Sequence, residues 1–147
     1  MTWRCISPNG CSEIGGPCPS CVPDNQIFVF GSNLAGRHGA GAAKHALDHH
    51  NAKYGQGIGL QGKSYGIPTK DHQIRTLDLD IIEQHVKTFI EFAKTRPDLQ
   101  FFVTKIGCGL AGYRDNDIAP MFVNAPDNCI LDEDWKVIHA KNVSNKG

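Results

Sequence analysis

The hydrophobic pattern from Ile27 onward alternates between short apolar runs and longer stretches with helical spacing. Ile27–Phe30 is a continuous apolar run, typical of a strand that is buried on both faces of a sheet, and Phe101–Ile106 has the same character. Between them, a single apolar stripe predicts a helix from about Asp80 to Thr95. The residues of this stripe are Ile82, Val86, Phe89, Ile90 and Ala93. Strands that alternate with helices favour an α/β fold.

Weaker signals complete the expected order of elements. They predict helices over about 40–53 and from about 115, and strands at 65–67, 129–131 and 135–140. Pro68 closes the first of these strands, because proline donates no hydrogen bond to a ladder. The chain contains no internal repeat, so we expect these elements to form one layered core.

Length and charge narrow the class of protein. The chain has 147 residues, a common length for one domain, and fifteen Lys and Arg balance fifteen Asp and Glu. A neutral chain lacks the basic signature of proteins held on nucleic acid mainly by counterion release. No run of about 18 apolar residues is present, and the N-terminus lacks the apolar stretch of a signal peptide. We therefore expect a cytoplasmic protein with no membrane partner.

Residues 1–25 differ from the rest in composition and in hydrophobic pattern, so we divide the chain into a Cys-rich segment, 1–25, and a domain, 26–147. The segment is rich in Cys, Pro, Gly and Ser and lacks apolar periodicity, as loops do. Its cysteines follow the spacing C-x5-C-x6-C-x2-C and are Cys5, Cys11, Cys18 and Cys21. Four thiolates suit a closed, tetrahedral structural zinc site. Free thiols are an alternative, and disulfides are a third that a cytoplasmic location disfavours.

Glycine-rich loops follow both of the apolar strands. The glycines are Gly31, Gly36, Gly39 and Gly41 in the first loop, and Gly107, Gly109 and Gly112 in the second. Ligands of open α/β sheets bind beyond the carboxyl ends of strands, where glycines let backbone N–H groups approach an anion and a helix N-terminus adds a favourable dipole. Two such loops facing each other fit a diphosphate; the alternative is that the glycines only make tight turns. Neither a P-loop nor the glycine order of a dinucleotide-binding fingerprint is present.

Histidines and cysteines of the domain lack complete catalytic or metal motifs. His45 and His49 share a helix face, but no glutamate stands in the H-E-x-x-H position, so we interpret them as part of a solvated polar face. Cys108 lies inside the second glycine loop with no base placed beside it. Cys129 falls in a predicted strand, where cysteine packs as a small apolar residue. We therefore expect no cofactor for chemistry, and only the structural zinc that the N-terminal cysteines suit.

Three segments resemble the ADP-ribose-binding macrodomains, in the order in which that family has them. FGSNLAGRHGAGAAKHAL, with Asn33 in the turn after a strand, resembles the asparagine–glycine loop of the family. GIPTKDH, at 66–72, is similar to the Pro-Thr-Lys segment of the branch that removes ADP-ribose from thymidine in DNA or from glutamate. VTKIGCGLAGYRDNDIAPMF, at 103–122, resembles the second loop. Nothing before Ile27 matches the Gly-Asp-Ile-Thr-like motif with which macrodomains usually recognise adenine.

The resemblance implies a macrodomain-like three-layer sandwich, with a mixed, largely parallel sheet and helices on both faces. It implies that Asn33 hydrogen-bonds the distal ribose, that Gly39 and Gly41 let this sugar approach the backbone, and that the second loop wraps the diphosphate. Tyr113 would then pack on the ribose. The implied ligand-binding residues are Ser32, Asn33, Gly36, Gly39, Gly41, Gly107, Cys108, Gly109, Leu110, Ala111, Gly112 and Tyr113.

The resemblance also implies candidate catalytic residues. Lys70 matches the catalytic lysine of the Pro-Thr-Lys branch, and a lysine whose pKa is lowered by burial or neighbouring cations can act as nucleophile or electrostatic stabiliser. Asp71 or His38 would supply acid–base help. The alternatives are that Lys70 is an exposed loop lysine and that His38 is a turn residue that tolerates unusual backbone angles.

The hypothesis is thus a protein that binds ADP-ribose or a related NAD-derived nucleotide. Hydrolysis of an ADP-ribosyl linkage would add ADP-ribosylated DNA or protein as a partner. One alternative is a non-catalytic sensor or sponge for an NAD-derived signal, which needs the two loops but not Lys70. Another is a zinc-stabilised interaction module in which the glycine loops are only structural.

Overall fold

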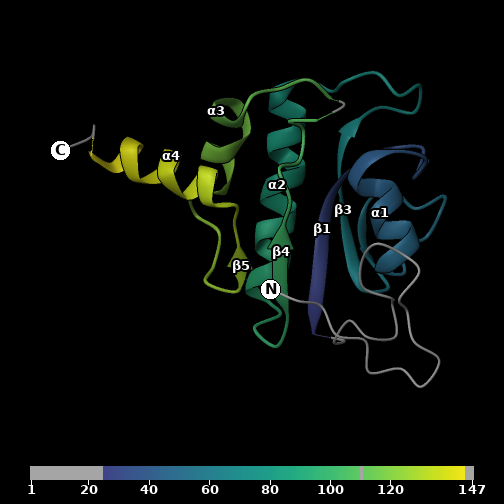
Figure 1. Cartoon of the computed structure of the whole chain (residues 1–147), viewed down its shortest axis with the longest axis horizontal. Coiled ribbons are helices and arrows are strands. Elements are labelled where there is room, and N and C mark those ends of the chain that lie inside the picture. The colour runs from purple at the N-terminus through teal and green to yellow at the C-terminus, as the bar shows by residue number, and fades with distance from the viewer. Residues whose placement is uncertain (1–24, 110, 145–147) are drawn as a thin grey trace.

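The computed structural model describes residues 25–109 and 111–144, so residues 1–24 of the Cys-rich segment, Leu110 and residues 145–147 lie outside the described residues. Within them, five strands form one mixed, mostly parallel sheet in the order β2-β3-β1-β4-β5, with helices on both faces (Figure 1). The elements are β1 (Gln26–Asn33), α1 (Gly41–His49), β2 (Gly59–Gln61), β3 (Ser64–Lys70), α2 (Leu79–Lys94), β4 (Gln100–Val103), α3 (Asp115–Ile118), the 3-10 turn η1 (Ala119–Phe122), β5 (Cys129–Ile130) and α4 (Glu133–Ser144). The predicted α/β sandwich is confirmed.

Strand β1 is the centre of the sheet. It pairs in parallel with β3 on one side, with Phe30 opposite Gly66, and with β4 on the other, with Phe28 opposite Phe102. Strand β5 extends the parallel part beside β4, and β2 runs antiparallel to β3. The carboxyl ends of β1, β3 and β4 therefore meet at one edge of the sheet, the upper edge in Figure 1.

Alternate residues of β1 face the two helical layers. Ile27 and Val29 belong to the large hydrophobic cluster that contains the buried stripe of α2, whereas Phe30 packs with Ala43 and Ala46 of α1. The two faces of this strand thus contact two different helices, because successive side chains of a strand point to opposite faces of the sheet. This strand holds the three layers together, which explains why its sequence is a continuous apolar run.

The helix predicted from its apolar stripe is α2, and all five stripe residues are buried. Phe89 lies at the centre of an aromatic cluster, with ring centroids 4.9 Å from Tyr65 of β3 and 5.3 Å from Phe101 of β4, both edge-on. Edge-to-face pairs at this spacing add to the free energy gained from apolar burial. The contact fixes α2 against the middle of the sheet.

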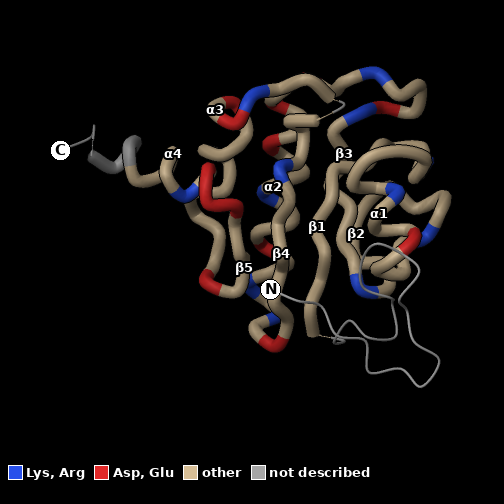
Figure 2. Tube along the Cα trace, viewed as in Figure 1, with Lys and Arg blue, Asp and Glu red and all other residues tan. Residues whose placement is uncertain are grey.

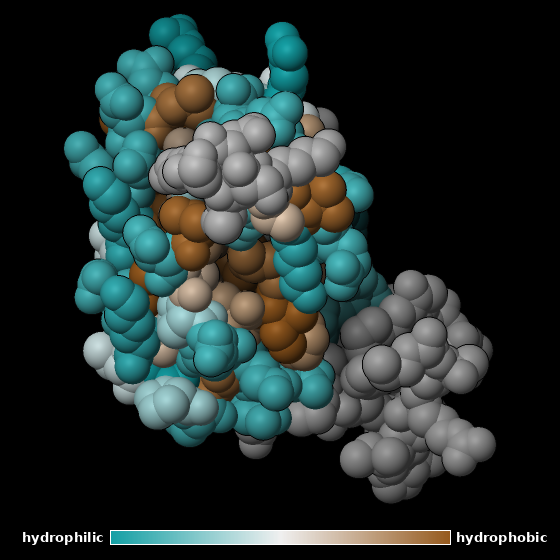
Figure 3. Space-filling model, turned by 90° about the vertical axis from the view of Figure 1, so that its left-hand side faces the viewer, coloured by the Kyte–Doolittle hydropathy of each residue, from teal (hydrophilic) through white to brown (hydrophobic). Residues whose placement is uncertain are grey.

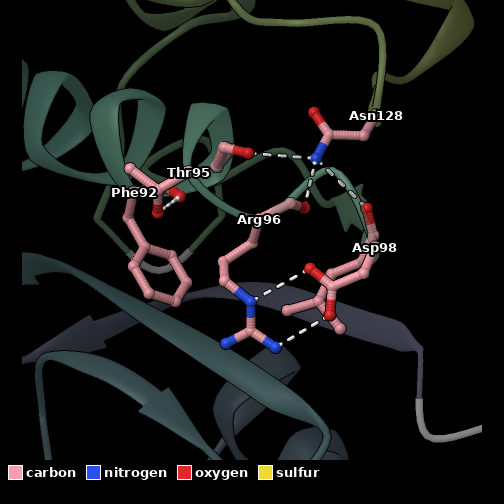
Figure 4. A network of polar contacts seen from close by, with 7 residues as sticks. Phe92, Thr95, Arg96, Asp98 and Asn128 are labelled. Carbon is pink, nitrogen blue, oxygen red and sulfur yellow. Dashed lines mark hydrogen bonds and ion pairs between the residues drawn. The ribbon is translucent and has the colours of Figure 1, made fainter.

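Asn128 caps the C-terminal end of α2, where helix carbonyls lack partners within the helix. Its side-chain amide nitrogen donates to the carbonyl oxygens of Ala93 at 3.1 Å, Arg96 at 2.9 Å and Leu99 at 3.1 Å (Figure 4). In the same turn the guanidinium of Arg96 forms a two-point ion pair with Asp98. The segment before β5 is thereby tied to the turn that leads into β4.

Two of the weaker secondary-structure predictions are wrong. Residues 135–140, expected as a strand, form part of α4: the acidic run 132–134 begins a helix, and the carbonyl of Asp132 accepts from the N–H groups of Trp135 and Lys136. The strand at 65–67 continues past Pro68 to Lys70 as β3. Pairing with β2 ends at Gly66, so the proline lies where β3 has become an edge strand and a missing N–H is tolerated.

The predicted solvated face of α1 is also wrong, because its histidines pack against the sheet. The His50 ring stacks on Phe28 with centroids 4.4 Å apart and planes within 2°, and His45 lies 4.5 Å from His49 and 5.2 Å from His50. His49 and His50 are buried. Burial lowers the pKa of His50 to about 4, helped by the nearby His45, His49 and Lys63, and lowers the pKa of His45.

Part of the sheet face on the α1 side is open. Phe102 of β4 and Ile130 of β5 are register partners on this face, and both are exposed by more than a third. Figure 3 shows apolar side chains, in brown, between hydrophilic rims on the side of the molecule that carries β5 and α4.

No helix in the described ranges has the length and apolar character needed to cross a bilayer.

The histidine cluster predicts that acidification destabilises the fold. Between pH 6.5 and about 4 the unfolded chain binds a proton that folded His50 does not, so the free energy of unfolding falls as pH falls through this window and levels off below it. Replacing His50→Phe keeps an aromatic ring against Phe28 and removes the titration. Denaturant unfolding at a series of pH values should show a shallower loss of stability in His50→Phe than in the wild type, and parallel curves would contradict the account.

Candidate functional site

A cavity of about 550 Å³ lies at the carboxyl ends of β1, β3 and β4. Its volume is within the range of about 300–1,000 Å³ that small-molecule sites occupy. The lining residues come from three loops and the first turn of α1: Gly31, Ser32, Asn33, Arg37, Gly39, Ala40, Gly41, Ala42, Ala43, Thr69, Lys70, Ile74, Thr104, Lys105, Ile106, Gly107, Gly109 and Ala111. Because α1 covers one face of the sheet and α2 the other, the chain leaves β1 and β3 in opposite directions here, which is where ligands of open α/β sheets bind.

The wall of this cavity is positively charged. Its charged residues are Arg37, Lys70 and Lys105, and none of the lining residues is acidic. Arg37 and Lys70 have no ion pair within the described part of the chain. Figure 2 shows blue positions along the loop that follows β3, at the end toward which the strand runs. Two of the three cations are therefore available to a bound anion.

The third cation, Lys105, is held by acidic residues behind the wall. Its ammonium lies 2.6 Å from an oxygen of Asp134 and 3.3 Å from one of Asp115. The hydrogen bond to Asp134 is the main cause of a raised pKa at Lys105, and Asp115 adds to it. Lys105 thus stays charged but is already neutralised, so it contributes less to the potential of the cavity than Arg37 or Lys70 does.

Asn33 shapes the first loop through its side chain. The amide nitrogen donates to the carbonyl of Arg37 at 2.9 Å, and the amide oxygen accepts from the N–H of Arg37 at 2.9 Å. These two bonds fix the backbone of Arg37 at the cavity wall. An asparagine amide carries two N–H groups, so one donor of Asn33 is left for a ligand.

The first turn of α1 forms part of the cavity wall. The first N–H groups of a helix have no partner inside it, and here they belong to Gly41, Ala42 and Ala43, which all line the wall. Ala40, at the N-cap position, supplies no side-chain cap. Gly41 begins the helix with φ +60°, a left-handed conformation that glycine adopts without strain. A helix N-terminus left open in this way is a common anion site.

The loops after β3 and β4 are joined beside the cavity. The hydroxyl of Thr76 donates to the carbonyl of Ala111 at 3.0 Å, and the hydroxyl of Tyr113 donates to the carbonyl of Leu77 at 2.6 Å. Gly107 has φ +75°, and an added Cβ there would lie 3.1 Å from Ile118, so glycine is required for the turn. The two loops therefore form one continuous wall.

The cavity brings together most of the residues that the sequence nominated. Of these, Ser32, Asn33, Gly39, Gly41, Lys70, Gly107, Gly109 and Ala111 line it. Gly36, Asp71, His38, Cys108, Gly112 and Tyr113 do not, and Leu110 lies outside the described residues. Among the nominated residues outside the wall, His38, Asp71 and Tyr113 have side-chain hydrogen bonds to other parts of the chain.

His38 and Asp71 have structural partners where the hypothesis expected acid–base roles. His38 is buried, edge-on to Phe30, and its Nε2 hydrogen-bonds to the side-chain oxygen of Gln61 at 3.1 Å. An amide oxygen only accepts, so Nε2 of His38 carries the hydrogen. The carboxylate of Asp71 accepts from the N–H groups of Gln73 and Arg75, both at 2.9 Å, and closes the loop after β3.

Cys108 also lies behind the wall. Burial raises the pKa of its thiol to about 12, and the neighbouring Asp115 adds to the effect. A thiol with such a pKa is protonated at neutral pH, and the thiolate is the nucleophilic form. Cys108 is therefore poorly suited to attack a substrate.

Sequence reasoning missed nine residues of the wall. They are Arg37, Ala40, Ala42, Ala43, Thr69, Ile74, Thr104, Lys105 and Ile106. All of them lie within four residues of a nominated residue, so the rule that strand ends carry ligand sites would have found them if applied to every side chain. Ile74, four residues after Lys70, gave no signal of its own, because an isoleucine near a predicted helix is usually a core residue.

A metal centre is not part of this cavity. Among the described residues, no group of three or more His, Cys, Asp or Glu side chains is arranged to hold a metal ion, and this includes His45, His49 and His50. The zinc hypothesis concerned Cys5, Cys11, Cys18 and Cys21, which lie outside the described residues. It stays a prediction.

Comparisons with known proteins found no match that indicates a function. No protein-family model matches the chain, and neither a curated protein nor a solved structure matches it. The likeness of its three segments to macrodomains stays a prediction from the sequence. What the protein binds has to be argued from the geometry and charge of the site.

Two glycines of the first loop should respond differently to substitution by alanine. Gly36 has φ +72°, and a Cβ there would lie 2.2 Å from the backbone of Gly55, whereas a Cβ at Gly39 meets nothing within 4 Å. Gly36→Ala should lower the free energy of unfolding by about 2–3 kcal/mol, and Gly39→Ala should change it by less than about 0.5 kcal/mol. Denaturant unfolding measures both. Equal stability of the two variants would show that Gly36 does not brace the loop.

Proposed function

We propose that the cavity binds ADP-ribose or a related NAD-derived nucleotide. The observation that carries the proposal is a wall of three basic and no acidic side chains at the carboxyl ends of three parallel strands. Such a wall favours a polyanion of small-molecule size. A diphosphate joined to sugars has this charge and these dimensions.

The phosphates would be held by two kinds of donor. Arg37 and Lys70 supply unpaired positive charge, and the open N-terminus of α1 supplies backbone N–H groups with the favourable end of the helix dipole. Gly109 has open space where a side chain would be, so its backbone is accessible to a ligand as well. Charge-assisted hydrogen bonds of this kind are about twice as strong as neutral ones.

The hydroxyl groups in the wall favour a sugar. Thr104 donates its hydroxyl hydrogen to the carbonyl of Val29 at 2.7 Å, Thr69 donates to the carbonyl of Ser32 at 3.3 Å, and Ser32 donates to the carbonyl of Gly57. Each hydroxyl has thus used its only hydrogen, and its oxygen keeps lone pairs. Oxygens that can only accept select for ligand donors, and ribose hydroxyls are such donors.

Binding is better supported than hydrolysis. Lys70 lines the cavity, but neither Asp71 nor His38 does, so among the described residues no carboxylate or imidazole is within the wall to move a proton. Hydrolysis of an ADP-ribosyl linkage is the second candidate function, and the place of Lys70 in the wall favours it. In that case the oxygen of water would bond to the anomeric carbon while the bond from that carbon to the modified group breaks, and the proton from water would pass to the leaving group or to solvent. The ammonium of Lys70 would stabilise the negative charge that develops on the leaving group.

Calorimetric titration tests the binding. Wild-type protein should bind ADP-ribose with micromolar affinity and AMP at least tenfold more weakly, because AMP lacks the second phosphate and the distal ribose. Gly109→Val should weaken ADP-ribose at least tenfold without loss of fold, since its side chain would enter open space in the cavity. Unchanged affinity in Gly109→Val would remove the second loop from the site, and absence of ADP-ribose binding by the wild type would overturn the proposal.

Single-turnover cleavage of ADP-ribosylated DNA and protein separates the two functions. Arg37→Ala and Lys70→Ala each remove one unpaired cation from the wall, so both should weaken binding of ADP-ribose. If the protein is only a binder, neither the wild type nor either variant releases ADP-ribose. Cleavage that Lys70→Ala abolishes and that Arg37→Ala retains at saturating protein would assign the chemistry to Lys70.

A further inference from the structure

Ile74 has a backbone conformation that isoleucine rarely adopts. Its φ is +63°, in the left-handed region, where the Cβ of an L-residue crowds the backbone and a branched side chain makes the crowding worse. Among the described residues, the other non-glycine residue with positive φ is Asn51, a type that tolerates it. Strain of this kind persists only where the surrounding structure imposes it, and it is concentrated at functional sites.

The loop after β3 imposes the conformation. The carboxylate of Asp71 accepts from the N–H groups of Gln73 and Arg75, the carbonyl of Asp71 accepts from the N–H of Ile74 at 3.1 Å, and the N–H of Asp71 donates to the carbonyl of Arg75 at 2.8 Å. A bridge between Lys70 and Thr76 closes the loop at its base. With both flanks held, Ile74 at the tip has little freedom to relax.

The side chain of Ile74 is not part of a hydrophobic core of the described residues. It belongs to neither of the two hydrophobic clusters of the described residues, it is 37% exposed, and it lines the cavity. The hydrogen bond from Thr76 to the carbonyl of Ala111 sets another apolar residue of the wall against the same loop. Lys70 lies at the base of this loop, so an apolar surface and an unpaired cation are presented to the cavity together.

We propose that Ile74 is a specificity-determining residue that contacts the adenine ring of the bound nucleotide. The inference rests on the proposed binding function, in which Lys70 holds a phosphate on the adenosine side, and it adds the group that selects the base end of the ligand. It does not rest on hydrolysis, which would place Lys70 at the distal ribose. A planar ring attached to a phosphorylated sugar needs an apolar surface beside a cation, and a ring that covers Ile74 removes the exposed side chain from water. The strained loop is kept because it presents this surface.

The test separates binding from folding, because glycine and asparagine both tolerate positive φ. Ile74→Gly and Ile74→Asn should be at least as stable as the wild type in denaturant unfolding, yet each should weaken ADP-ribose about tenfold, the scale expected for loss of one partly buried apolar contact. Asn51→Gly, which changes the other positive-φ residue outside the cavity, is the matched control and should bind as the wild type does. Ribose 5-phosphate, which lacks adenine, should bind the wild type and both Ile74 variants equally in an NMR titration.

Each outcome decides the inference. Wild-type affinity for ADP-ribose in both Ile74 variants would overturn it and leave the proposed function intact. Weaker binding by Ile74→Gly but not by Ile74→Asn would also overturn it, because loop stiffness would then be the cause. Equal weakening of ADP-ribose and ribose 5-phosphate would assign Ile74 to the sugar phosphate instead of the base. A wild type that binds neither ligand would overturn the proposed function and this inference with it.

Discussion

Parallel hydrogen bonding of β1 to strands on both sides decides where this protein can hold a ligand. Because β3 and β4 run in the same direction as β1, three strands end at one edge, and each continues into a loop there. The helices that follow β1 and β3 pack on opposite faces of the sheet, so the loops diverge and leave the cavity between them. The alternating apolar residues of β1 supply both cores, which makes this arrangement the stable one.

Some residues around the cavity brace it and others face it, and Asn33 does both. Asn33, Asp71 and Thr76 use their side chains to tie backbone atoms together, and they thereby fix where Arg37, Lys70 and Ile74 project. Side chains that face a ligand must be held by others whose own contacts are already made. The positive wall follows from this division: the acidic side chains nearby pair with Lys105 behind the wall or close loops, and they stay out of the cavity.

The elements that the sequence predicted are those whose burial is continuous or strictly periodic, such as β1 and the stripe of α2. The failures have physical causes. Strand β2 has three residues, begins with a glycine and shows no period. The apolar residues at 135–140 resemble a strand, but the acidic residues before them begin a helix, α4. Glycines and Asn33 pointed to the loops of the site, but Arg37 and Ile74 did not stand out, since their positions depend on hydrogen bonds made by neighbours.

The central claim is that an anionic nucleotide occupies the cavity at the ends of β1, β3 and β4. Amide chemical shifts in ¹H–¹⁵N spectra test it most directly, because they report where the ligand lies as well as whether it binds. On titration with ADP-ribose, the largest shifts should fall on the amides of Gly41, Gly107 and Gly109, with those of β5 and α4 unchanged. Shifts confined to β5 and α4, or no shifts at millimolar ligand, would contradict the account.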